Sequence, residues 1–166
     1  MTAETDYLAR TDGTFFSTPV FVFDREIGYR CRTGTTRLVS LAKGELVYDN
    51  RATFNNFGQH ASYDYSPKKR SPDVFRIVVL GDSLTNGINM QRTWTETLQE
   101  LLRARPDNGR EVEVYAFPVD GGGILNWHAV FMRRILPVFE FDALILGDTT
   151  NDYSGKFITA HSTKKG

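Results

Sequence analysis

The sequence has one cysteine, no long apolar run and no excess of either charge. Cys31 alone permits neither an intramolecular disulfide nor a cysteine-rich zinc site. Twenty basic and 20 acidic side chains balance, so nothing predicts a nucleic-acid partner or an anionic membrane surface. No apolar run approaches the roughly 18 residues that a membrane helix needs. Met1–Thr14 is polar and lacks the apolar centre of a signal peptide, which predicts a cytoplasmic protein.

Composition divides the chain into a β-rich part, a core and a tail. Residues 1–70 are predicted to be a β-rich N-terminal extension and linker, in which β-prone stretches such as Val20–Phe23 alternate with glycine and asparagine. Ser66–Asp73 is polar and holds two prolines, so we expect an α/β core to follow over residues 71–155. Residues 156–166 are predicted to form a polar tail.

The predicted core alternates strands and helices. Its first strand is nearly continuously apolar, as in a strand buried on both faces of a parallel sheet. Its first helix opens with Thr93 and Glu96 at the spacing of a capping box. Right-handed crossovers would join the strands into a three-layer α/β/α, flavodoxin-like parallel sheet, incomplete at its C-terminal side and preceded by the β-rich extension. The predicted elements are Phe75–Leu80, Thr93–Arg105, Glu111–Phe117, Ile124–Leu136 and Ala143–Leu146.

Unusual residues follow each predicted strand. The segments are Gly81-Asp82-Ser83, Asp120–Gly123 and Gly147–Asp152. Because ligands bind outside the carboxyl ends of parallel strands, we expect the three loops to meet at one edge of the sheet.

These loops carry groups suited to acyl transfer. Ser83 lies where a strand turns toward a helix, so its hydroxyl can face solvent, although a serine there can also serve only as a helix cap. The glycines after Asp120 allow backbone N–H groups to approach a substrate closely, and Asn151 offers a side-chain N–H. One serine with such donors matches attack on an ester carbonyl. Asp82 and Asp152 are predicted to support their turns through hydrogen bonds.

The motifs resemble those of the GDSL/SGNH hydrolases. Gly81-Asp82-Ser83-Leu84 reproduces the first block of that family, VEVYAFPVDGG aligns with the second, and Asn151-Asp152 aligns with the end of the third. The resemblance implies that Ser83 is the nucleophile and that the oxyanion hole is built from Ser83, Gly121 and Asn151. It implies an esterase or acyltransferase acting on a small acyl ester or acylated carbohydrate, without a cofactor or metal.

The resemblance is incomplete. Ala116 stands where the second block usually has asparagine, and Thr149 stands where the third usually has glycine. The fourth block, Asp-x-x-His, does not occur after Asn151, so the sequence resembles the first half or two-thirds of such a hydrolase, either truncated or degenerate. We expect this chain to be incomplete or inactive by itself, and the source of the base is open. His161 is a weak candidate for a substitute base.

Two other functions stay open at this point. The first is a non-catalytic remnant that keeps the crevice and binds a ligand. Alternatively, Asp82, Asp120, Asp148 and Asp152 are loop carboxylates of the kind that hold Mg²⁺ for phosphate-ester chemistry. In either case a sheet that ends at its third strand would expose an apolar edge and favour self-association.

Overall fold

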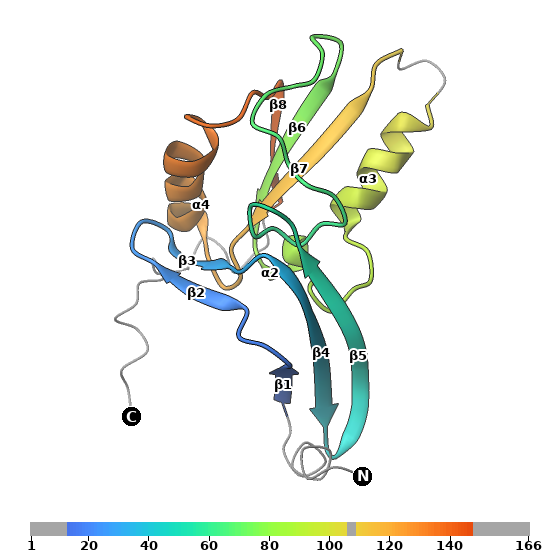
Figure 1. Ribbon diagram of the computed structural model, residues 1–166, viewed down its shortest axis with the longest axis vertical. Helices are drawn as coiled ribbons and strands as arrows, with labels where there is room; N and C mark the ends of the chain where they lie inside the picture. Colours follow the sequence, from blue (N-terminus) through green and yellow to red (C-terminus); the bar gives the residue numbers. More distant parts are fainter. Residues whose placement is uncertain (1–12, 106–108, 148–166) are drawn as a thin grey trace.

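A computed structural model describes residues 13–105 and 109–147 (Figure 1). Eight strands and four helical segments follow one another along the chain. In order they are β1 (Gly13–Phe16), β2 (Phe21–Asp24), β3 (Gly28–Cys31), β4 (Gly34–Ala42), β5 (Glu45–Phe54), β6 (Phe75–Gly81), α2 (Ser83–Asn86), α3 (Trp94–Arg103), β7 (Val112–Pro118), α4 (Ile124–Val130), the π-helical turn η1 (Phe131–Ile135) and β8 (Ala143–Gly147).

The first five strands form two antiparallel sheets. Strands β1, β4 and β5 make one sheet, and β2 pairs with β3 in a separate hairpin. The turn between β4 and β5 uses Lys43 and Gly44, both with positive φ, as a tight hairpin turn requires. The long β4–β5 hairpin extends away from the rest of the molecule (Figure 1).

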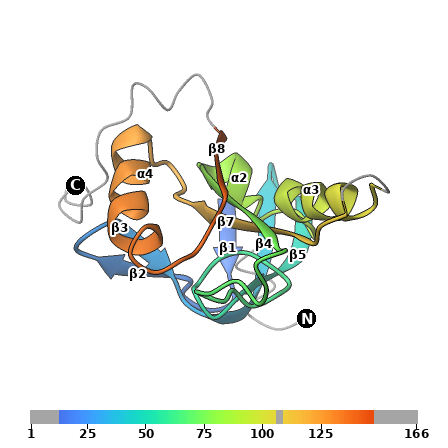
Figure 2. The same cartoon turned by 90° about the horizontal axis from the view of Figure 1, so that it is seen from above.

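The last three strands form a parallel sheet in the order β7-β6-β8. The predicted strands at Phe75–Leu80, Glu111–Phe117 and Ala143–Leu146 are thereby confirmed within one or two residues. Helix α3 lies on one face of this sheet and α4 on the other (Figure 2). The predicted capping box is present, because Thr93 Oγ1 accepts from Glu96 N and Glu96 Oε2 accepts from Thr93 N.

The predicted three-layer α/β/α, flavodoxin-like class is wrong. Strands make up 39% of the structure and helices 20%, and only one of the three sheets is parallel. The physical reason is that the extension supplies much of the packing. Ile27, Ala61 and Tyr65 join the core on the α4 face of the parallel sheet, where a flavodoxin-like domain would place helices. The two parts share this core, so the division near residue 71 stays a prediction.

Side chains close the outer edge of β7. The Tyr65 hydroxyl accepts from Ala116 N at 2.9 Å, and Gln99 Oε1 accepts from Val114 N at 2.8 Å. Tyr63 and Arg103 donate to two further carbonyls of the same strand. These bonds satisfy backbone groups that would otherwise offer a template for another strand.

A fully buried arginine fixes the amino end of the parallel sheet. Arg76 has no exposed surface and donates to Glu113 at 2.8 Å. Its guanidinium lies 4.4 Å from the centre of the Tyr115 ring. It also donates to four backbone carbonyls, those of Ser66, Pro67, Lys68 and Glu140. Every nitrogen of the guanidinium therefore has a hydrogen-bond acceptor, as a buried charge requires.

The helices give no sign of a membrane span. Among residues 13–105 and 109–147, no helix is both long enough and apolar enough to cross a bilayer.

Candidate active site

Ser83 begins a one-turn helix directly after the central strand of the parallel sheet. Its side chain is exposed, whereas every residue from Arg76 to Asp82 is buried. Asp82 is the N-cap, and its Oδ1 accepts from Leu84 N at 2.9 Å. The alternative in which Ser83 serves as the helix cap is therefore wrong. Gly87, with φ of 52°, ends the helix in the left-handed conformation.

The turn before Ser83 is tightly packed. A Cβ on Gly81 would overlap Oγ1 and Cβ of Thr85, and a Cβ on Gly147 would also press on Thr85 Oγ1. Gly81 and Gly147 are register partners on β6 and β8. The buried Thr85 side chain thus fits over two adjacent strand ends, which requires glycine at both.

The second loop lies against the first. Val119 N donates to Gly81 O at 2.9 Å, so the chain leaving β7 stays bonded to the end of β6. Gly121 has φ of 68° and is exposed, and Gly123 is the N-cap of α4. The expected meeting of the first two loops at the carboxyl end of the sheet is confirmed, and the oxyanion role of Gly121 stays a prediction.

A partly buried amide–carboxylate pair joins the two loops. Asn86 Nδ2 lies 2.8 Å from Oδ1 and 2.9 Å from Oδ2 of Asp120. Burial raises the pKa of Asp120, the hydrogen bond from Asn86 opposes that rise, and the nearby Asp82 carboxylate adds to it. A carboxyl group with a raised pKa, bonded to the one-turn helix that Ser83 begins, is the kind of perturbed group that gathers at functional sites.

Two residues of the N-terminal extension contact the Asn86–Asp120 pair. His60 Nδ1 lies 2.7 Å from Asn86 O, and the Tyr29 hydroxyl donates to Asp120 O at 2.7 Å. Burial, together with the Asp120 charge, raises the pKa of Cys31 to about 12, so the thiol stays protonated at neutral pH. The sequence carries no signal for these contacts, because they join segments 26 and 91 residues apart.

Of the third predicted loop, Gly147–Asp152, the structure describes only Gly147. Asn151 and Asp152, together with Asp148 and His161, lie beyond the described residues. Of the carboxylates considered for Mg²⁺, Asp82 and Asp120 are described, and within the described ranges no group of three or more His, Cys, Asp or Glu side chains is arranged to hold a metal ion.

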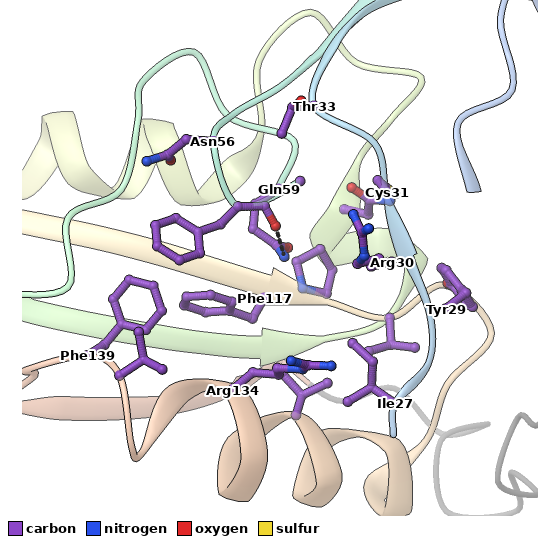
Figure 3. Close-up of a pocket in the computed structure, with 17 residues that line it drawn as sticks. Ile27, Tyr29, Arg30, Cys31, Thr33, Asn56, Gln59, Phe117, Arg134 and Phe139 are labelled. Atoms are coloured by element: carbon purple, nitrogen blue, oxygen red, sulfur yellow. Dashed lines mark hydrogen bonds between the residues drawn. The ribbon is translucent and has the colours of Figure 1, made fainter. Parts of the chain in front are cut away.

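A cavity of about 320 Å³ opens beside Asn86 (Figure 3). It lies between the β2–β3 hairpin, the turn at residues 56–59, the end of β7 and the α4–η1 segment. Ser83 is not among the residues that line it. The lining residues are Ile27, Tyr29, Arg30, Cys31, Thr33, Asn56, Phe57, Gly58, Gln59, Asn86, Phe117, Pro118, Val119, Val130, Arg134, Val138 and Phe139.

No protein-family model matches the chain, and no curated protein sequence matches it significantly.

Proposed function

We propose that the carboxyl end of the parallel sheet is a serine ester hydrolase or acyltransferase site of the GDSL/SGNH type. In this proposal Ser83 is the nucleophile and a small acyl ester, or an acylated carbohydrate, is the substrate. The proposal rests on the sequence motif together with the geometry around it.

The observation that carries the proposal is the setting of Ser83. An exposed hydroxyl follows six buried strand residues and a buried cap, at the end of the central strand. The neighbouring strand delivers its own glycine loop to the same end, bonded to β6 through Val119. A nucleophile needs this combination of a fixed backbone and an accessible side chain.

The proposed reaction uses the residues that the motifs assign. Ser83 Oγ would attack the acyl carbonyl, and its proton would pass to a base. The N–H groups of Ser83 and Gly121 and the side chain of Asn151 would hold the negative oxygen. Each such donor is typically worth about 2.7–4 kcal/mol of transition-state stabilisation.

The base is not among the described histidines. His60 is buried and bonded to Asn86 O, and His128 is exposed on α4. No hydrogen bond joins either of them to Ser83 in the described ranges. The proposal therefore predicts slow acylation of Ser83 that an added base accelerates.

Release of p-nitrophenol from p-nitrophenyl acetate tests the proposal, measured with and without added imidazole. We expect the wild type to exceed Ser83→Ala, and imidazole to widen the difference. Ser66→Ala is the matched control, because it removes an exposed serine hydroxyl at the opposite end of the sheet. Equal rates for the wild type and Ser83→Ala under both conditions would refute the proposal.

The absence of a histidine bonded to Ser83 in the described ranges favours one second candidate, a binding module that keeps the crevice without turnover. It predicts equal p-nitrophenol release by the two proteins, together with binding of an acyl ester that Ser83→Ala leaves intact.

A further inference from the structure

The cavity beside Asn86 belongs to both parts of the chain. Tyr29 and Phe57 come from the extension, whereas Phe117 and Val130 come from the core, and Figure 3 shows side chains from both converging on one space. Its volume of about 320 Å³ lies at the lower end of the range for ligand pockets. Because Ser83 does not line it, an inference about its ligand goes beyond the proposed function and does not depend on it.

One end of the cavity is aromatic. The ring of Phe139 lies 4.9 Å from that of Phe57 and 5.1 Å from that of Phe117, both edge to face. Val119 and Val130 add aliphatic wall. An apolar group gains from leaving water against these side chains.

The charged side chains that line the cavity are all positive. Two arginines and no aspartate or glutamate line the cavity. Arg134 is already paired with Asp24 at 2.7 Å and with Glu26 at 2.9 Å. Arg30 is exposed and makes no ion pair within the described residues. It is therefore the lining cation available to an anion.

The wall between these two ends is polar but uncharged. Burial raises the pKa of both Tyr29 and Cys31, so the phenol and the thiol stay protonated at neutral pH. Asn86 and Gln59 contribute amides. A second charge on the ligand would find no partner along this wall, which limits a ligand to one charged end.

We propose that this cavity binds a small amphipathic carboxylate, with its apolar chain against Phe117 and Phe139 and its carboxylate at the guanidinium of Arg30. The volume corresponds to about ten water-sized units, which suits a chain of roughly eight carbons. Because both parts of the chain supply lining residues, the ligand stabilises their packing against each other.

Two substitutions address the two ends. Val138 lines the cavity and is 42% exposed, so Val138→Trp adds bulk from the solvent side without disrupting the core. Leu136→Trp is its matched control, since Leu136 is also exposed and does not line the cavity. Arg30→Gln removes the guanidinium, and Arg32→Gln removes an exposed neighbouring one that does not line the cavity.

Isothermal titration with octanoate and with octan-1-ol gives the test. We expect both to bind, octanoate more tightly. Arg30→Gln weakens octanoate about tenfold, as expected for loss of a charge-assisted bond, and leaves octanol unchanged. Val138→Trp abolishes both, and both control variants match the wild type. In NMR spectra of the wild type, octanoate shifts the ring signals of Phe117 and Phe139, which locates the ligand without any substitution.

Several results would overturn the inference. Absence of octanoate binding refutes it outright. An equal affinity for octanoate in Arg30→Gln refutes the carboxylate position, and unchanged ring signals refute the location. Ser83→Ala should bind octanoate as the wild type does, since a loss of binding there would place the ligand at the serine instead. That last arm separates failure of this inference from failure of the proposed function.

Discussion

The two ends of the parallel sheet differ in how completely their polar groups are paired. At the amino end, Arg76 is entirely buried and every donor of its guanidinium is directed at a carboxylate or a carbonyl. At the carboxyl end, Ser83 is exposed, and the carboxyl group of the partly buried Asp120 has a raised pKa. At the amino end, every donor of the buried charge has a partner. At the carboxyl end, the exposure of Ser83 and the raised pKa of Asp120 are not states that folding by itself favours.

This difference separates structural polar residues from candidates for chemistry. A buried charge whose partners are all in place is inert, because any reaction would break several bonds at once. A carboxyl group with a raised pKa and an exposed serine are residues of the kind that gather at functional sites. The motif residues therefore lie at the end of the sheet where the polar groups are not all required for stability.

The largest expected effect is at the amino end. Arg76→Met should lower the free energy of unfolding by about 3–5 kcal/mol, because it leaves Glu113 and four carbonyls without their partner. Chemical denaturation measures the loss. Arg37→Met provides the contrast, since the Arg37–Asp49 pair lies on the surface and its removal should change stability little. Similar stabilities for the two variants would remove the structural role given to Arg76.

A smaller loss is expected at the carboxyl end from Gly81→Ala. The new Cβ meets the buried Thr85 side chain, and overpacking of this kind typically costs about 1–3 kcal/mol. Thr85→Ala in the same chain should recover part of the loss, because it removes the overlapping atoms. Thermal unfolding of the single and double variants checks this, and a single variant as stable as the wild type would contradict the close packing described above.

The pH dependence of stability should have opposite signs at the two ends. Burial raises the pKa of Asp120, so the folded state binds the proton more tightly than the unfolded chain, and stability falls as pH rises from the ordinary value of 3.8 through the raised one. At Asp142, burial also raises the pKa, but hydrogen bonds from Lys69 and from Arg76 N outweigh it, so the pKa is lowered and stability is lost as pH falls.

Urea denaturation at several pH values between about 3 and 7 measures both effects. Relative to the wild type, Asp120→Asn should gain stability as pH rises, and Asp142→Asn should lose it. The same sign for both variants would show that the two carboxyl groups do not differ as described.

The smallest expected effect is on association rather than stability. Leu144 and Leu146 on β8 are 40% and 51% exposed, whereas side chains close the backbone of β7. We therefore expect concentration-dependent self-association through the β8 side in size-exclusion chromatography. Leu146→Lys should reduce it, and Leu101→Lys, at a more exposed position on α3, should not. A cooperative monomer at all concentrations would argue against this.

Local patterns predicted much of the core and little of its surroundings. The apolar run at Phe75–Leu80 and the capping box of Thr93 and Glu96 depend on neighbouring residues, so they could be identified from the sequence. The burial of Arg76 could not, because one of its carbonyl partners is 64 residues away. The fold class was wrong for the same reason, since the extension covers a sheet face that the helical pattern assigned to helices.

The candidate site likewise has a part that could be predicted from the sequence and a part that depends on tertiary packing. The turn around Ser83 and its approach by the Asp120 loop follow from strand order and could be predicted. The Asn86–Asp120 pair and the contact of His60 with Asn86 depend on tertiary packing across 34 and 26 residues, and no spacing rule reports them. The cavity is also invisible to the sequence, because its walls come from both parts of the chain.

Covalent labelling of Ser83 tests the central claim most directly. The protein is incubated with a fluorophosphonate and imidazole, digested, and mapped by mass spectrometry. We expect a phosphonyl adduct on the peptide that carries Ser83, none on the peptide that carries Ser66, and loss of the adduct in Ser83→Ala. Equal labelling of the two serines, or no adduct on Ser83, would contradict it.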